Sequence, residues 1–111
     1  MAYTSRIAWE ALRSVDSTTL AGAYVALGTP LAHPSYILKM VNNSDTDVLV
    51  SVDGVNPIDV CPAGSFWLYD EGKIGLSAGY PGMPQGTQIY ISGTVGTAGS
   101  IYLVSQYIVY L

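Results

Sequence analysis

Few side chains in this sequence are equipped for chemistry, and their spacing decides what they could do. His33 is the only histidine and Cys61 the only cysteine among the 111 residues. A Ser-His-Asp or Cys-His arrangement would have to be built around His33, but there is no GxSxG motif and Cys61 lies between apolar residues in VCPAG. We therefore expect His33 to make a loop contact and Cys61 to be a buried, unreactive thiol.

The carboxylates show no catalytic or metal-binding spacing. Four aspartates follow one another at short intervals: Asp45, Asp47, Asp53 and Asp59. No Glu closes a calcium loop of the EF-hand type around them, so we expect them to solvate turns and strand edges. Asp70 and Glu71 are adjacent, and adjacent strand residues point to opposite faces, so they do not form the carboxylate pair of a glycosidase.

The glycine pattern GTVGTAG (93–99) resembles a phosphate-binding loop only in its spacing. No helical segment and no Lys follow it, so it predicts a flexible or bulged hairpin connection. One Cys and one His are also too few for a structural zinc site. The sequence thus predicts a protein that is not an enzyme and has no catalytic residue, cofactor or metal.

The composition points to a covered surface. Half of the residues are hydrophobic and only 11% are charged, whereas the average soluble domain has about 25% charged residues. A surface so poor in charge is usually covered by a partner, although a small domain with a neutral surface remains the alternative. The basic residues are too few and scattered to neutralise a run of phosphates, which excludes nucleic acid as the main partner; they are Arg6, Arg13, Lys39 and Lys73.

No membrane association is predicted. No uncharged apolar run reaches the roughly 18 residues of a membrane-spanning helix, and no basic segment followed by an apolar one begins the chain. We expect the protein to be made in the cytoplasm without a sorting signal.

Strand signals dominate the chain, because β-branched and aromatic runs are bounded by Gly, Pro, Asn and Asp. About eight antiparallel strands in one domain, residues 1–111, predict an all-β, two-sheet sandwich of the jelly-roll type. Residues 1–16 are expected to form an edge strand or a partner-contacting arm. The expected strands lie within 4–17, 18–31, 35–44, 46–54, 66–69, 87–93 and 100–111, with short ones around Val60 and after Lys73.

Three groups of residues are candidates for partner contact, with core packing as the alternative for each. The N-terminal segment combines aromatic and basic side chains, which are preferred at interfaces. The loop 79–85 and the outward face of the last strand supply further apolar side chains, the latter for contact with a second copy. The candidates are Arg6, Trp9, Arg13, Tyr80, Met83, Tyr102, Ile108 and Tyr110.

Several phrases in order resemble the small capsid decoration proteins, also called cement or staple proteins, of short-tailed bacteriophages. The phrases are RIAWEALRSVDSTTL, ALGTPLAHPSYILKMVNNSDTDVLVSVDG, PAGSFWLYD and GTQIYISGTVGTAGSIYLVSQY. The resemblance implies a jelly-roll-like sandwich on the outer surface of the virion head, made in the host cytoplasm, that clamps neighbouring major capsid protein subunits. It also implies a homo-oligomer, with a dimer favoured, and it carries over no catalytic residue.

Two other functions stay open at this stage. An exposed platform built from Trp9, Trp67, Tyr69 and Tyr80 would suit a carbohydrate-binding or receptor-binding module. A head–neck or tail structural protein could have the same sandwich, and the number of copies per virion would distinguish it from a decoration protein.

Overall fold

The computed structural model describes residues 6–70 and 83–109, and these residues form two antiparallel β-sheets. A single 3-10 turn, Ser17–Thr19, is the helical element of the described residues. The all-β sandwich predicted from the strand pattern is confirmed. The strands are β1 (Arg6–Trp9), β2 (Arg13–Asp16), β3 (Val25–Ala26), β4 (Ile37–Ser44), β5 (Val48–Ser51), β6 (Asp59–Cys61), β7 (Phe66–Asp70), β8 (Tyr90–Ser92) and β9 (Gly99–Val109).

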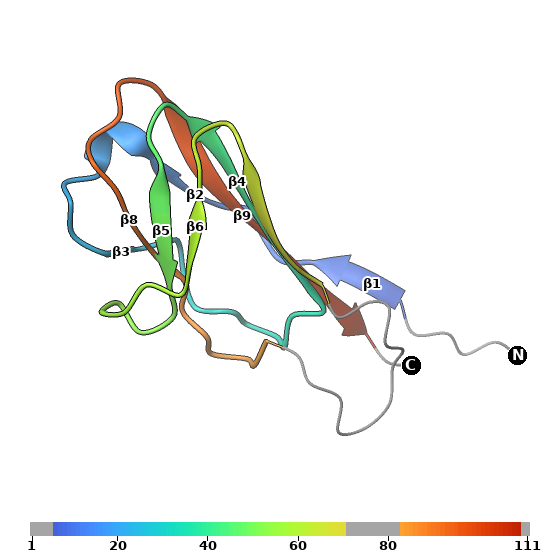
Figure 1. Cartoon of the computed structure of the whole chain (residues 1–111). Helices are drawn as coiled ribbons and strands as arrows, with labels where there is room; N and C mark the ends of the chain where they lie inside the picture. Colours follow the sequence, from blue (N-terminus) through green and yellow to red (C-terminus); the bar gives the residue numbers. More distant parts are fainter. Residues whose placement is uncertain (1–5, 71–82, 110–111) are drawn as a thin grey trace, which may run out of the picture.

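The strand order is that of a jelly roll. The first sheet has the order β1-β9-β4-β7, with β2 also pairing with β9, and the second has the order β3-β8-β5-β6. If β1 and β2 are taken as one interrupted strand, each strand of the first half pairs antiparallel with its counterpart in the second half. The hairpin β5–β6 closes this series, as in a long hairpin rolled up into two sheets (Figure 1).

The core lies between the two sheets and follows from the alternation of the strands. In β4, Leu38 and Met40 are buried while Lys39 is exposed, and in β5, Val48 and Val50 are buried while Leu49 is exposed. Side chains of this period-2 pattern fill the interior from both sides. The buried apolar residues are Leu20, Leu27, Leu31, Leu38, Met40, Val48, Val50, Cys61, Ile89, Ile91, Ile101 and Leu103.

The strand β9 is the longest and lies in the interior of the first sheet. Its first part pairs with β2 on one side and β4 on the other, and its last residues pair with β1. Beyond Gln106, which is opposite Ile37, β9 pairs only with β1 among the described strands. Arg6–Trp9 and residues 106–109 therefore form a two-stranded ribbon that extends from the end of the sheet (Figure 1).

The structure differs from the sequence predictions in the second expected strand. Only Val25–Ala26 of the segment 18–31 is a strand, because the chain first makes the 3-10 turn and later leaves the sheet as a loop that covers the core with Leu27 and Leu31. The strand expected after Lys73, and the candidate contacts Tyr80 and Tyr110, lie outside the described residues.

Candidate interaction surface

A β-bulge separates β1 from β2 and sets which side chains point inward. Trp9 lies opposite Gln106 and Arg13 opposite Leu103, so four steps along the first segment match three along β9. Glu10 still pairs with Ser105 through its backbone N–H, which leaves the extra residue in the Ala11–Leu12 segment. In a regular strand, residues three apart point to opposite faces, but the bulge turns Glu10 and Arg13 to the same side.

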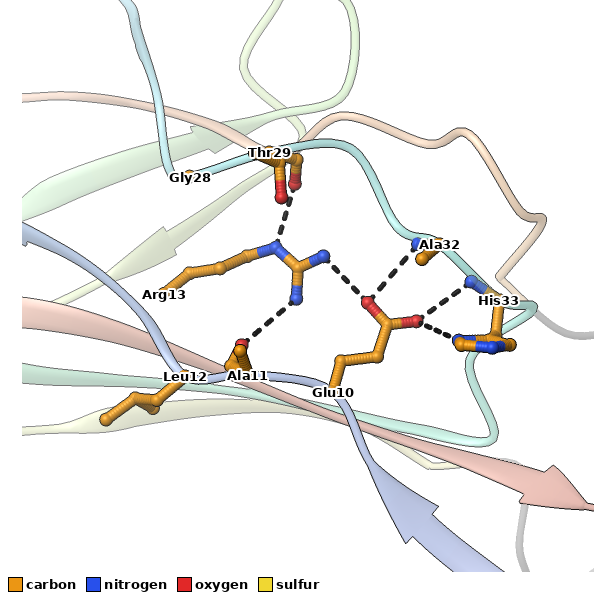
Figure 2. A pocket seen from close by; sticks show the side chains of 8 residues that line it. All are labelled: Glu10, Ala11, Leu12, Arg13, Gly28, Thr29, Ala32 and His33. Carbon is orange, nitrogen blue, oxygen red and sulfur yellow. Dashed lines mark hydrogen bonds and ion pairs between the residues drawn. The ribbon is translucent and has the colours of Figure 1, made fainter.

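Glu10 and Arg13 form a buried ion pair on the inner side of this bulge. Arg13 Nη2 lies 2.7 Å from Glu10 Oε1, and the two side chains are only 7% and 5% exposed. The guanidinium also donates to main-chain carbonyls of the loop that follows β3: Nε to Thr29 O at 2.8 Å, and the same Nη2 to Pro30 O at 3.0 Å. Figure 2 shows Arg13 between Thr29 and Glu10.

The Glu10 carboxylate fastens the far end of the same loop. It accepts hydrogen bonds from the backbone N–H groups of Ala32 and His33, and His33 Nδ1 lies 2.9 Å from its Oε2 (Figure 2). The His33 ring stacks on Tyr107 of β9, with centroids 3.7 Å apart. We call Glu10, Arg13 and His33 with these loop contacts the charged junction. It joins the ribbon, the bulge and the loop between β3 and β4.

The close approach of this loop to Arg13 requires glycine at position 28. Gly28 has φ +74°, and a Cβ there would lie 2.5 Å from Arg13 Cγ. Only glycine combines this left-handed backbone conformation with the absence of a side chain. The stem of Arg13 is thus packed directly against the main chain of the loop.

A pocket of about 480 Å³ lies beside the charged junction and is lined by Glu10, Ala11, Leu12, Arg13, Gly28, Thr29, Ala32 and His33. Its charged groups are already committed to neighbours within the chain. Burial raises the pKa of Glu10, but hydrogen bonds from Arg13, His33 and Ala32 outweigh burial and lower the pKa below 4.5. A carboxylate held ionised by a permanent cation and backbone donors is suited to fastening a loop.

Several other ionisable groups also have structural partners. Hydrogen bonds from the backbone N–H groups of Asn56 and Val55 hold the pKa of Asp53 well below its ordinary range, and Asp45 accepts hydrogen bonds from Thr97. Burial raises the pKa of the Cys61 thiol, which is fully buried as expected. Within residues 6–70 and 83–109, no three His, Cys, Asp or Glu side chains are grouped for metal binding.

The glycine-rich segment 93–99 connects β8 to β9, but it is not the predicted hairpin connection, because β8 and β9 lie in different sheets and do not pair. Gly99 has φ +93°, and a Cβ there would lie 2.0 Å from Asn43 O in the neighbouring strand β4. Glycine at position 99 therefore allows the backbones of β9 and β4 to approach each other closely.

The outward side of the first sheet exposes apolar side chains. In β1, Ile7 and Trp9 point outward, and Trp9 is 61% exposed. In β7, Phe66 and Leu68 point outward, and Phe66 is 63% exposed. The paired registers of the strands place the partly exposed residues of β4 and β9 between these two edges. We call this surface the outer face; its apolar members are Ile7, Trp9, Ile37, Val41, Phe66, Leu68, Tyr102, Val104 and Ile108.

A second apolar surface lies on the opposite side of the sandwich. Leu49 of β5 is directly opposite Val60 of β6, and both are exposed on the outward side of the second sheet. Ile58 precedes β6 in the same alternation, and its N–H donates to Val50 O. Val52 and Val55 in the connecting segment are exposed as well. We call these five residues the hairpin patch.

The structure separates the predicted contact residues into distinct groups. Trp9, Tyr102 and Ile108 lie on the outer face, so side chains expected to belong to two different contacts share one surface. Arg6 is exposed but points to the opposite side of β1 from Ile7, so it is not on the outer face. Met83 packs against the core, next to its β-bridge to Ser35. Arg13 is buried in the charged junction, which corrects the expectation that its guanidinium is offered to a partner.

Sequence reasoning missed the outer-face residues of β7 and the whole hairpin patch. Phe66 and Leu68 alternate with Trp67 and Tyr69, and the pattern alone does not say which pair is inward. The structure packs Trp67 and Tyr69 against the core, with Trp67 Nε1 donating to Asp59. This arrangement removes two members of the expected sugar platform, and a third, Tyr80, lies outside the described residues.

Comparison of the chain with protein families, with curated proteins and with solved structures finds no match. No helix in the described part of the chain has the length and apolar character needed to cross a membrane. What can be inferred about function therefore starts from the exposed surfaces.

Proposed function

We propose that this chain is a non-enzymatic structural protein of a tailed-bacteriophage virion. It would bind the outer surface of the head and clamp neighbouring major capsid subunits, which stabilises the shell. The support is the jelly-roll sandwich together with the resemblance of several sequence phrases to capsid decoration proteins.

The observation that carries the proposal is that both outward sides of the sandwich expose apolar side chains. A two-sheet sandwich fills its core with the inner faces, and its outer faces are normally solvated. Here Trp9 and Phe66 stand on one side and Leu49 and Val60 on the other. A rigid module with a binding surface on each side can join two neighbours, either two capsid subunits or a capsid subunit and a second copy.

A bridging role also fits the low fraction of charged residues in the sequence. Few charges have to be desolvated when such a surface is covered. Each contact can be weak, because the second contact of a bivalent clip forms at the high effective concentration set by the first. We propose that the chain acts as a homo-oligomer, a dimer being favoured, and that neither nucleic acid nor a membrane is its partner.

The test is a binding measurement on undecorated, expanded heads of the phage that encodes the chain. Purified protein is mixed with heads, the heads are pelleted, and bound copies per head are counted. Saturation at hundreds of copies with raised thermal resistance of the head is the expected result. Saturation at six or twelve copies would indicate a neck or tail protein, and absence of binding would overturn the proposal.

Replacement of Trp9 by Ala tests the surface itself. Trp9 is exposed, so we expect the variant to keep its stability to within about 0.5 kcal/mol. It should nevertheless lose most of its binding to heads, because aromatic side chains dominate interface energies. A variant that fails to fold, or that binds as the unmodified chain does, would remove Trp9 from the contact.

A further inference from the structure

The strand β7, at one edge of the first sheet, lacks the features that normally keep an edge strand from pairing. It is five residues long and contains no Pro, Lys or Arg. It pairs with β4 over its whole length, residue for residue and without a bulge. Exposed edges of this kind pair readily with other strands, so natural proteins usually shorten them, charge them or interrupt them.

The other edges of the two sheets carry such features. β1 begins with Arg6, and the bulge separates it from β2. β3 has only two residues. β6 has three and is flanked by Pro57, two residues before it, and Pro62, directly after it, and proline limits the pairing of an edge strand. Among the strands that the structure describes, β7 is therefore the edge left open.

The backbone of β7 offers hydrogen-bonding groups on this open side. The N–H of Asn42 in β4 donates to Ser65 O, so the backbone of Ser65 faces β4. Successive residues of an antiparallel strand face opposite neighbours, so the N–H and C=O groups of Phe66, Leu68 and Asp70 face away from β4. No described residue bonds to these groups of Phe66 and Leu68. The side chains of both are exposed as well.

This edge is complementary to a second copy of itself. When two β7 strands meet antiparallel with Leu68 opposite Leu68 of the second copy, Phe66 of each copy lies opposite Asp70 of the other. All the outward backbone groups then fall in hydrogen-bonded pairs. The contact is the same from both sides, as a twofold axis requires. An apolar pair lies at its centre, and the two Asp70 carboxylates are at opposite ends.

We propose that β7 pairs antiparallel with β7 of a second copy around a twofold axis at Leu68. This inference rests on the homo-oligomer of the proposed function, for which it names the contact. The first sheets of the two copies join into one continuous sheet. Because residues directly opposite each other point to the same face, the outer faces of both copies lie on the same side of that sheet.

The first experiment measures the dimer dissociation constant by sedimentation equilibrium for the unmodified chain and three variants. Leu68→Lys places two like charges opposite each other across the axis, and Phe66→Lys makes a similar change on the same edge but faces Asp70 of the second copy. Leu49→Lys is the control on the second sheet, since Leu49 is exposed to a similar extent. Circular dichroism checks that every variant is folded, which is expected because all three side chains are exposed.

We expect Leu68→Lys to raise the dimer dissociation constant at least about 30-fold, because juxtaposed like charges oppose association. Phe66→Lys should keep the dimer, since its new charge meets a carboxylate, and Leu49→Lys should leave the constant unchanged. If Phe66→Lys weakens the dimer as much as Leu68→Lys, the register around Leu68 is wrong.

The second experiment tests the axis directly by cross-linking. Opposite residues of a hydrogen-bonded antiparallel pair have Cα atoms about 5.5 Å apart, a separation that a disulfide can span. Leu68→Cys should therefore form a disulfide-linked dimer under mild oxidation, seen by electrophoresis without reductant. Leu49→Cys is the matched control and should stay monomeric in that gel. The buried Cys61 is present in both variants and in the unmodified chain.

The outcomes separate this inference from the proposed function. If the unmodified chain is a dimer that Leu68→Lys leaves intact, or if Leu49→Cys cross-links as readily as Leu68→Cys, the contact at β7 is wrong while the homo-oligomer stands. If the unmodified chain is a monomer at every concentration, both the contact and the homo-oligomer are overturned. Binding to heads is decided separately by the pelleting assay.

Discussion

Arg13 and Lys39 are both cations of one sheet, on the two strands that flank β9, yet their surroundings are opposite. Arg13 lies on the inner side, where Glu10 and two loop carbonyls use its donors. Lys39 lies exposed on the outer side, with no ion pair to another residue in the described part of the chain. A cation whose partners are buried within the chain stabilises the fold, whereas an exposed cation contributes little to it.

The largest effect expected from this comparison is on the inner side. Arg13→Ala should lower the free energy of unfolding by about 3–5 kcal/mol, because it leaves the buried Glu10 carboxylate without its cation. Lys39→Ala, the matched change on the outer side, should stay within about 0.5 kcal/mol. Chemical denaturation of the two variants measures both values. Equal losses in the two would contradict the division between an inner cation that the fold needs and an outer cation that it does not need.

A smaller effect is expected where the loop approaches Arg13. Gly28→Ala should cost about 3 kcal/mol, since it combines backbone strain with a clash against the Arg13 stem. Gly22→Ala is the control, because Gly22 also has positive φ but a Cβ there meets nothing within 4 Å. Thermal unfolding should show the larger loss at position 28. A loss of the same size at both positions would mean that contact with Arg13 adds nothing.

The smallest of these effects depends on pH. Glu10→Gln should cost about 2 kcal/mol near neutral pH, where the carboxylate is ionised and accepts charge-assisted hydrogen bonds. Because the folded-state pKa of Glu10 is lowered from 4.5, its contribution is fully present above pH 4.5 and is lost as the pH falls below that value. Unfolding free energies measured from pH 7 to pH 3 should therefore converge for the variant and the unmodified chain. A difference that is independent of pH would show that the carboxylate's charge is not involved.

Much of the fold could be predicted from sequence because it depends on local patterns. The alternation of residues in 35–44 and 46–54 predicted strands with two distinct faces, and the turn residues marked where strands end. The alternation also has a limit, which Val52 illustrates. It continues the pattern of Val48 and Val50, but the strand ends at Ser51 and Val52 is exposed.

The candidate surface was harder to predict because it depends on register. Arg6, Trp9 and Arg13 look equivalent in the sequence, and only the bulge between Trp9 and Arg13 turns one of them inward. Similarly, β7 has two apolar pairs on opposite sides, Phe66 and Leu68, and Trp67 and Tyr69. The second sheet covers one side of β7 and so determines which pair is buried. A pattern of period 2 defines two faces but does not say which of two apolar faces is covered.

The position of β9 also determines how the chain can fold. This last described strand pairs with β1, β2 and β4, so the first sheet is joined by contacts between residues nearly a whole chain length apart. Contacts of such sequence separation make folding slow, because a large loop must be closed before they stabilise anything. During synthesis the first sheet stays incomplete until β9 has left the ribosome. Until then the edges of β2 and β4 remain open to other strands, which makes a nascent or truncated chain prone to aggregation.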